Sequence, residues 1–189
     1  MSDGFADRSD GDLAALSLTG EQAAFSALVR RHKEPLHRLV ARLIGDDGEA
    51  LDLVQEAFVS AHGALRHYDP NRPMRAWLSR IAINKARDWG RRRAVRRLIS
   101  AVLPLADAVH AADDAPDAET VASDRQEFAG VAAAIAALPS NLREALVLRT
   151  IEGLSQAEAA ETLGVSEKTV ETRLYRARLK LAERIGSIP

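Results

Sequence analysis

A ridge of aromatic, amide and cationic side chains marks the stretch between residues 74 and 97. Met74, Leu78, Ile81 and Ala82 recur at the spacing of one buried helix face. Another face of the same helix is polar and presents, at steps of three and four residues, Trp77, Arg80, Asn84, Arg87 and Arg91. Arginines contact phosphates and an indole stacks on an unpaired base, so this ridge suits a nucleic acid. The alternative is that Trp77 belongs to the core and the arginines form a solvated helix end.

A second polar group lies upstream, where Asp52, Gln55 and Glu56 are neighbours one helical turn apart. Paired carboxylates at this spacing could hold a metal or perform acid–base chemistry. No histidine or third carboxylate accompanies them, and a solvated or protein-contacting ridge is therefore favoured. The five histidines show no metal-ligand spacing, and His32 falls at the edge of an apolar stripe. The chain is not expected to bind a cofactor or metal.

The third group is a pair of short helices between Leu154 and Leu181. Ser155 can cap the first helix in a capping box with Glu158, and Gly164 supplies the left-handed residue of the turn. Ser166 can cap a second helix, whose apolar stripe consists of Val170, Leu174, Ala177 and Leu181. This pattern predicts a helix-turn-helix whose second helix enters the DNA major groove, the alternative being an ordinary helical hairpin.

Composition restricts the rest of the 189-residue chain. Hydrophobic residues make up 47% and aromatic residues only 4%, which favours helix throughout, and the absence of cysteine excludes disulfides and thiolate sites. The N-terminus is acidic without a signal-like apolar run, so we expect a soluble cytoplasmic protein without a membrane span. Residues 66–97 hold eleven basic and two acidic side chains, a balance of +9, whereas residues 98–127 hold seven acidic and one basic, a balance of −6. This segregation indicates polyanion-binding modules separated by an acidic connector.

These groups require an all-α fold of two small helical domains. We expect a disordered acidic segment at 1–18, a first domain at 19–98, a linker at 99–123 and a second domain at 124–189. The first helix should begin at Thr19 with Gln22 completing a capping box, and Pro35 should kink or break it. The next helix, near 49–67, should bury a stripe that includes Leu51. In the second domain, about four helices should end in the helix-turn-helix.

Two sequence blocks resemble one protein family. DLVQEAF at 52–58 and RAWLSRIAINKARDWGRRR at 75–93 resemble domain two of the extracytoplasmic-function sigma factors of bacterial RNA polymerase. The segment from Leu138 to Leu181 resembles their domain four. DPNRPMRAWL and GLSQAEAAETLG resemble the cobalt-nickel resistance branch of that family. Both blocks occur in the family's order, separated by an acidic linker.

The resemblance implies three contact surfaces. The first surface would contact the clamp helices in the largest subunit of core polymerase and would consist of Asp52, Leu53, Gln55 and Glu56. The minus-ten promoter element would be opened and read by Tyr68, Asn71, Trp77, Arg80, Asn84, Lys85, Arg87 and Arg91. The minus-thirty-five element would be met by Lys168, Thr169, Glu171, Thr172, Arg173, Tyr175 and Arg176, with the two arginines as candidates for bidentate guanine contacts.

The implied partners are core RNA polymerase, including its flap, promoter DNA and an anti-sigma factor. The implied function is promoter recognition and opening for transcription initiation, without enzymatic activity in the chain itself. A stand-alone helix-turn-helix regulator that binds duplex DNA as a dimer is the main alternative, but it leaves the Asp52 to Glu56 ridge unexplained. A recombinase or nuclease would need a catalytic Ser, Tyr or carboxylate cluster, and no such residues with supporting neighbours are found.

Overall fold

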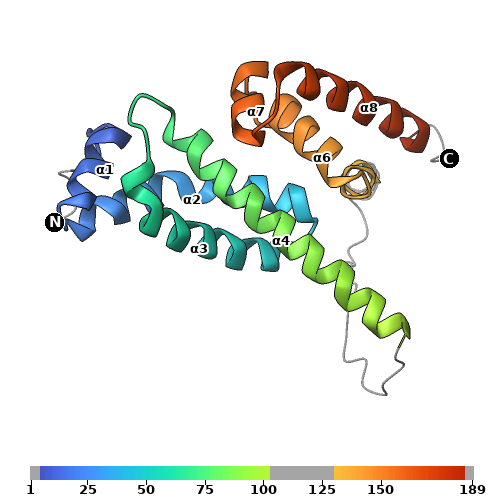
Figure 1. Ribbon diagram of the computed structural model, residues 1–189, viewed down its shortest axis with the longest axis horizontal. Coiled ribbons are helices and arrows are strands. Elements are labelled where there is room, and N and C mark those ends of the chain that lie inside the picture. The colour runs from blue at the N-terminus through green and yellow to red at the C-terminus, as the bar shows by residue number, and fades with distance from the viewer. Residues whose placement is uncertain (1–4, 103–129, 186–189) are drawn as a thin grey trace, which may run out of the picture.

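The computed structural model describes residues 5–102, with side chains to residue 96, and residues 130–185. In these residues every regular element is a helix (Figure 1). The elements are α1 Asp10–Leu18, α2 Gln22–Ile44, α3 Asp47–Ala64, η2 Leu65–His67, α4 Met74–Val102, a helical segment at 130–136, α6 Ser140–Leu146, the π-helical turn η3 Val147–Ile151, α7 Gln156–Leu163 and α8 Glu167–Ile185. This confirms the expected all-α class.

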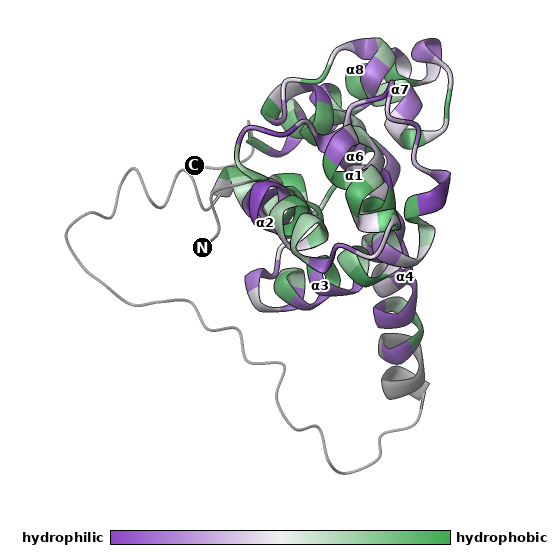
Figure 2. Ribbon diagram, turned by 90° about the vertical axis from the view of Figure 1, so that its left-hand side faces the viewer, coloured by the Kyte–Doolittle hydropathy of each residue, from purple (hydrophilic) through white to green (hydrophobic). Residues whose placement is uncertain are grey.

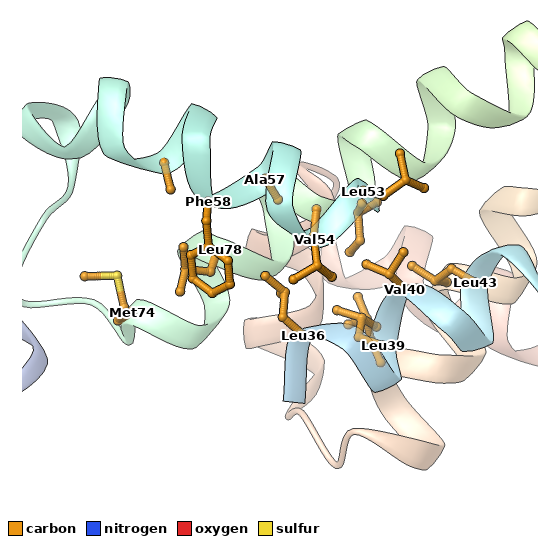
Figure 3. Close-up of a cluster of buried hydrophobic side chains, with 14 of the residues drawn as sticks. Leu36, Leu39, Val40, Leu43, Leu53, Val54, Ala57, Phe58, Met74 and Leu78 are labelled. Atoms are coloured by element: carbon orange, nitrogen blue, oxygen red, sulfur yellow. The ribbon is translucent and has the colours of Figure 1, made fainter. Parts of the chain in front are cut away.

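The N-terminal domain, α1 to α4, is a bundle in which α2, α3 and α4 pack against one another. Its core combines α2 residues such as Leu36 and Val40 with Val54 and Phe58 of α3 and Leu78 of α4 (Figure 3). Hydrophobic residues gather where the helices meet, as Figure 2 shows. Burial of these apolar faces is the main stabilising contribution to the bundle.

Helix α2 runs without a break from Gln22 to Ile44, although Pro35 lies inside it. Pro35 therefore does not break the helix, because the buried residues on both sides of it hold one continuous helix against the core. Gly45 ends α2 in the left-handed region, at φ 73°, as its position in the sequence predicts.

The N-terminal segment is ordered earlier than its acidic composition suggests. Helix α1 begins at Asp10, and its N-cap Ser9 accepts a hydrogen bond from the Asp12 N–H at 3.1 Å. Leu13 is fully buried against the bundle. This apolar contact holds the segment in place, whereas a disordered segment would bury no such residue. The expected disorder of residues 1–18 is thus wrong for residues 10–18, and Thr19 ends α1 rather than starting α2.

The predicted α3 stripe packs into the core except at its first member, Leu51. Leu51 is 37% exposed, whereas Leu53 is only 2% exposed and lies in the core. The buried stripe follows Ala50, Leu53, Val54, Ala57, Phe58 and Ala61, so Leu51 belongs to the outer face. The sequence pattern was ambiguous because leucines occupy both faces of this helix.

The C-terminal domain comprises residues 130–185. Its core joins Leu138, Leu142 and Leu146 to Ala177 of α8, with Leu174 and Leu181 packed beside them. Three members of the predicted α8 stripe, Leu174, Ala177 and Leu181, therefore pack in this core. Helix α4 extends to Val102, past the predicted boundary at 98; the rest of the predicted linker and the predicted start at 124 lie outside the described residues.

Candidate nucleic-acid interface

The helix-turn-helix is held by local hydrogen bonds that the sequence predicted. The Glu158 N–H donates to Ser155 Oγ at 3.2 Å and the Ser155 N–H donates to Glu158 Oε2 at 2.7 Å, which completes the capping box. These hydrogen bonds lower the pKa of Glu158. Gly164 adopts φ 67° at the turn, and Ser166 Oγ accepts from the Thr169 N–H at 3.2 Å to cap α8. The predicted capping and turn residues are confirmed.

Helix α8 separates a buried face from an exposed one. Val170 and Ala177 are fully buried, whereas Tyr175 is 64% exposed and Arg176 is exposed. Near the start of the helix, Lys168 pairs with Glu171 at 3.2 Å, and the Thr172 hydroxyl donates to the Lys168 carbonyl at 2.9 Å. The remaining predicted members, Thr169 and Arg173, are half-buried. The helix therefore presents a continuous polar surface away from its own domain.

The predicted minus-ten residues fall on α4 and on the loop before it. Trp77 packs its ring against the core and against Tyr68, at a centroid distance of 5.3 Å. The Tyr68 hydroxyl donates to the Arg72 carbonyl at 2.6 Å, and Asn71 donates from its backbone to Asp69 Oδ1 at 3.0 Å. Burial raises the pKa of Tyr68, with Asp10 and Asp69 adding to the shift. Trp77 therefore combines a core role with a place beside the loop.

Further along α4, the polar residues have different partners. Asn84 is exposed and accepts a hydrogen bond from Arg87 Nη1 at 3.2 Å. Arg87 also donates to both carboxylate oxygens of Glu144, which raises the pKa of Arg87. Lys85 instead points to Glu56 on α3, at 3.6 Å, and Arg91 pairs with Asp88 one turn earlier. Arg80 is exposed and lies close to Gly164, so the turn of the helix-turn-helix lies near α4.

The predicted polymerase surface is the outer face of α3. Asp52, Gln55 and Glu56 are exposed on it, beside the exposed apolar residues Leu51 and Val59. Leu53 is the exception, because its side chain lies in the core and faces no partner. Its inclusion among the polymerase contacts is therefore corrected, and the apolar part of this surface is supplied by Leu51 and Val59.

Comparison with known proteins decides the family. The family described as Sigma-70 region 2 matches residues 28–97, and Sigma-70, region 4 matches residues 129–181. The chain is 44% identical over 177 residues to the RNA polymerase sigma factor CnrH of Cupriavidus metallidurans, covering 92% of both chains. This chain belongs to the extracytoplasmic-function sigma factors.

Two further likenesses agree with this assignment. The sigma factor is 34% identical over 180 residues to the ECF RNA polymerase sigma factor SigM of Mycobacterium tuberculosis, covering 95% of this chain and 86% of SigM. It also resembles a solved structure of CnrH in complex with the cytosolic domain of CnrY, with 37% identity and a TM-score of 0.68 over 95% of this chain and 99% of that one.

The structure of the sigma factor also contains side-chain contacts that its sequence did not reveal. Trp89 donates from Nε1 to Glu49 Oε2 at 2.8 Å, with the Arg93 guanidinium 4.9 Å from the ring centroid, and so fixes α4 against the start of α3. Glu144, Glu152 and Glu161 of the C-terminal domain meet arginines of the N-terminal domain. No local spacing signals such pairs, because their partners are far apart in the sequence.

The described parts of the sigma factor contain no helix long and apolar enough to cross a membrane. Within residues 5–102 and 130–185 there is also no group of three or more histidine or acidic side chains arranged to hold a metal ion.

Proposed function

We propose that this sigma factor binds core RNA polymerase, directs it to promoters with minus-ten and minus-thirty-five elements, and helps to separate the promoter strands. The observation that supports this most strongly is the presence of two different DNA-type surfaces on separate domains. One is a capped helix-turn-helix with an exposed polar face, and the other is a helix with an aromatic residue, an amide and arginines in succession. The polymerase would supply the chemistry of transcription, in the cytoplasm, and the sigma factor would supply recognition.

Helix α8 is assigned to the upstream element. Its exposed face would lie in the major groove, with Arg176 and Arg173 donating to guanine edges and Lys168 and Thr172 contacting the adjacent DNA backbone or bases. Glu171 could accept from the amino group of cytosine.

Helix α4 and the loop from Tyr68 to Asn71 are assigned to the minus-ten element. Asn84 has an exposed amide that can read the edge of an unpaired base, and Trp77, which packs against Tyr68, lies two helical turns before it on α4. Arg80, Arg87 and Arg91 would contact the phosphates of the DNA backbone. Lys85 instead faces α3 and pairs with Glu56, so its role would be to position Glu56.

The outer face of α3 is assigned to the clamp helices of the polymerase. Its exposed leucine and valine lie beside a carboxylate and amide ridge, so this face offers both apolar area and polar groups to a protein partner. The C-terminal domain would contact the flap. We also propose an anti-sigma partner for this chain, since the similar CnrH forms a complex with the cytosolic domain of CnrY.

Transcription by purified core polymerase, with and without this chain, tests the proposal directly. The templates would be promoter fragments from the source genome, and the expected result is initiation only when the chain is present. A dimeric regulator would instead bind duplex DNA tightly alone and would not confer initiation. Absence of chain-dependent initiation from every promoter fragment would refute the proposal.

A further inference from the structure

The start of α1 is fastened to α2 by polar contacts. Arg31 of α2 donates to Asp10 Oδ1 at 2.6 Å and to the backbone carbonyls of Ala6 and Arg8, both at 3.0 Å. The other carboxylate oxygen of Asp10 lies 3.0 Å from His32 Nε2. Two consecutive residues of α2 therefore hold the first turn of α1 and the segment before it in one position.

The same turn of α1 lies against the loop that leads into α4. Both lie at one end of the N-terminal domain (Figure 1). Gly11 comes so close to this loop that a Cβ atom added to it would lie 3.3 Å from Pro70 Cβ, which is tighter than most such contacts. Around this contact, residues 9–12 and the loop border an open hollow of about 540 Å³. A glycine therefore permits the close approach of the two segments.

The loop is braced internally, so a shift at Pro70 would be passed to its neighbours. Asp69 Oδ1 accepts hydrogen bonds from the backbone N–H and the side-chain amide of Asn71, at 3.0 and 3.1 Å. Pro70 stands between this acceptor and this donor. The Tyr68 hydroxyl closes the loop by donating to the Arg72 carbonyl at 2.6 Å. The position of Pro70 therefore affects where the exposed Asn71 side chain is presented.

Helix α1 is poorly suited to contact DNA itself. Its first turn carries two carboxylates, Asp10 and Asp12, which would repel phosphate groups. The Asp12 carboxylate also accepts from the hydroxyl of Ser9, the N-cap of α1, at 2.7 Å. An influence of α1 on promoter recognition must therefore pass through the loop that it touches.

We infer that α1 is the support that sets the position of the loop reading the minus-ten element, with Asp10 and Gly11 as positioning residues. The inference rests on the proposed function of that loop. Asp10 fixes α1 to α2, Gly11 lets Pro70 approach, and the loop then presents Asn71 to an unpaired base in one position. A binding group must be held within about 0.5 Å of its productive position to discriminate between ligands, and this support provides such a constraint.

Replacement of Gly11 by alanine perturbs the support without removing any contact. Alanine favours helix more than glycine does, so α1 should still form, whereas the added methyl group should push Pro70 away. Gly48→Ala is the matched control, because Gly48 is also the second residue of a helix, α3, that follows an aspartate N-cap. A Cβ atom at Gly48 would have Asp46 Oδ1 as its nearest neighbour, at 3.7 Å, which is an ordinary contact.

The readout is the base preference of holoenzyme assembled from core polymerase and the full-length chain. The probe is a single-stranded DNA library with a short randomised stretch, and sequencing of the bound fraction gives the preference at every position. Asn71→Ala identifies the position that the loop reads. Loss of an amide contact should reduce the preference there about tenfold, and its displacement in Gly11→Ala should reduce it about threefold. Gly48→Ala should leave every preference unchanged.

Two further variants test the route of the effect. Pro70→Gly removes the Cβ atom that the new methyl group would meet, so Gly11→Ala should have no further effect in that background. Asp10→Ala releases α1 from Arg31 and should reduce the preference at the same position. Asp12→Ala, which removes the same charge from the same turn, should not reduce it.

The outcomes separate this inference from the proposed function. If Asn71→Ala changes a preference but Gly11→Ala and Asp10→Ala do not, the loop reads DNA without support from α1 and the inference is overturned. A uniform loss of binding to all sequences would reflect less folded protein and would overturn the positioning role as well. An equal effect of Gly11→Ala with and without Pro70 would overturn the route through that residue. No effect of Asn71→Ala at any position would overturn the DNA role of the loop, and the inference with it.

Discussion

Replacement of Arg176 by alanine gives a sharp test of the upstream promoter contact. A helix turns about 100° per residue, so Arg176 lies about 120° around α8 from Val170, which is fully buried. Arg176 is exposed on the polar face next to Tyr175. Its truncation should therefore leave the core of the C-terminal domain intact and affect only the contact with DNA.

The size of the effect follows from the assigned contact. A bidentate arginine–guanine pair contributes about 1–3 kcal/mol of discrimination, and about 1.4 kcal/mol corresponds to a factor of ten. Arg176→Ala should thus reduce initiation at promoters that depend on the upstream element by about 5- to 140-fold. If the arginine contacts only phosphate, the loss should instead be uniform across sequences and the salt dependence of binding should weaken by about one counterion.

The assay is initial transcript synthesis at limiting sigma factor, on one template with the upstream element and one on which the sequence of that element is scrambled. Arg178→Ala is the matched control, because Arg178 is exposed on the same helix but lies nearer its apolar stripe. Equal losses for both variants, or an equal loss by Arg176→Ala on both templates, would refute the assignment of Arg176.

Further predictions concern the other surfaces and the stability of the fold. Asn84→Ala should slow promoter opening about tenfold, measured by fluorescence of a base analogue in the minus-ten element, while duplex binding by the C-terminal domain stays unchanged; equal effects on both steps would contradict the assignment. Asp52→Lys should weaken binding to core polymerase roughly tenfold in a fluorescence titration, whereas Glu34→Lys on α2 should not. Ser155→Ala should lower the unfolding free energy by about 1 kcal/mol in urea titrations, because it removes the N-cap of α7; an unchanged value would show that the cap is dispensable. Burial lowers the pKa of His32 despite its hydrogen bond to Asp10, so the unfolded chain binds more protons just below pH 6.5. The unfolding free energy should therefore fall as the pH drops through 6.5, and His32→Gln should flatten this dependence in urea titrations at several pH values.

Much of the site could be predicted because its determinants are local. Ser155, Glu158 and Gly164 specify their helix ends through hydrogen bonds and backbone conformations within a few residues. The exposed ridge at Asp52, Gln55 and Glu56 likewise followed from helical spacing alone.

Residues whose burial depends on distant packing were harder to predict. The sequence did not show that Leu53 is buried and Leu51 exposed. Both are leucines on the same helix, and only the position of α2 and α4 decides which one is buried. The formation of helix α1 could not be predicted for a similar reason, because Leu13 is buried by helices that come later in the chain.

The sequence by itself determined two helical domains, the ends of the helix-turn-helix and the segregation of charge between segments. Only the tertiary structure decided that Glu144, Glu152 and Glu161 face the arginines of α2, α4 and the loop before α4. The ion pair between Arg72 and Glu161 spans 89 positions, and that between Arg42 and Glu152 spans 110. Helical periodicity states which side of a helix is polar, but the partner of a polar side depends on how the domains pack.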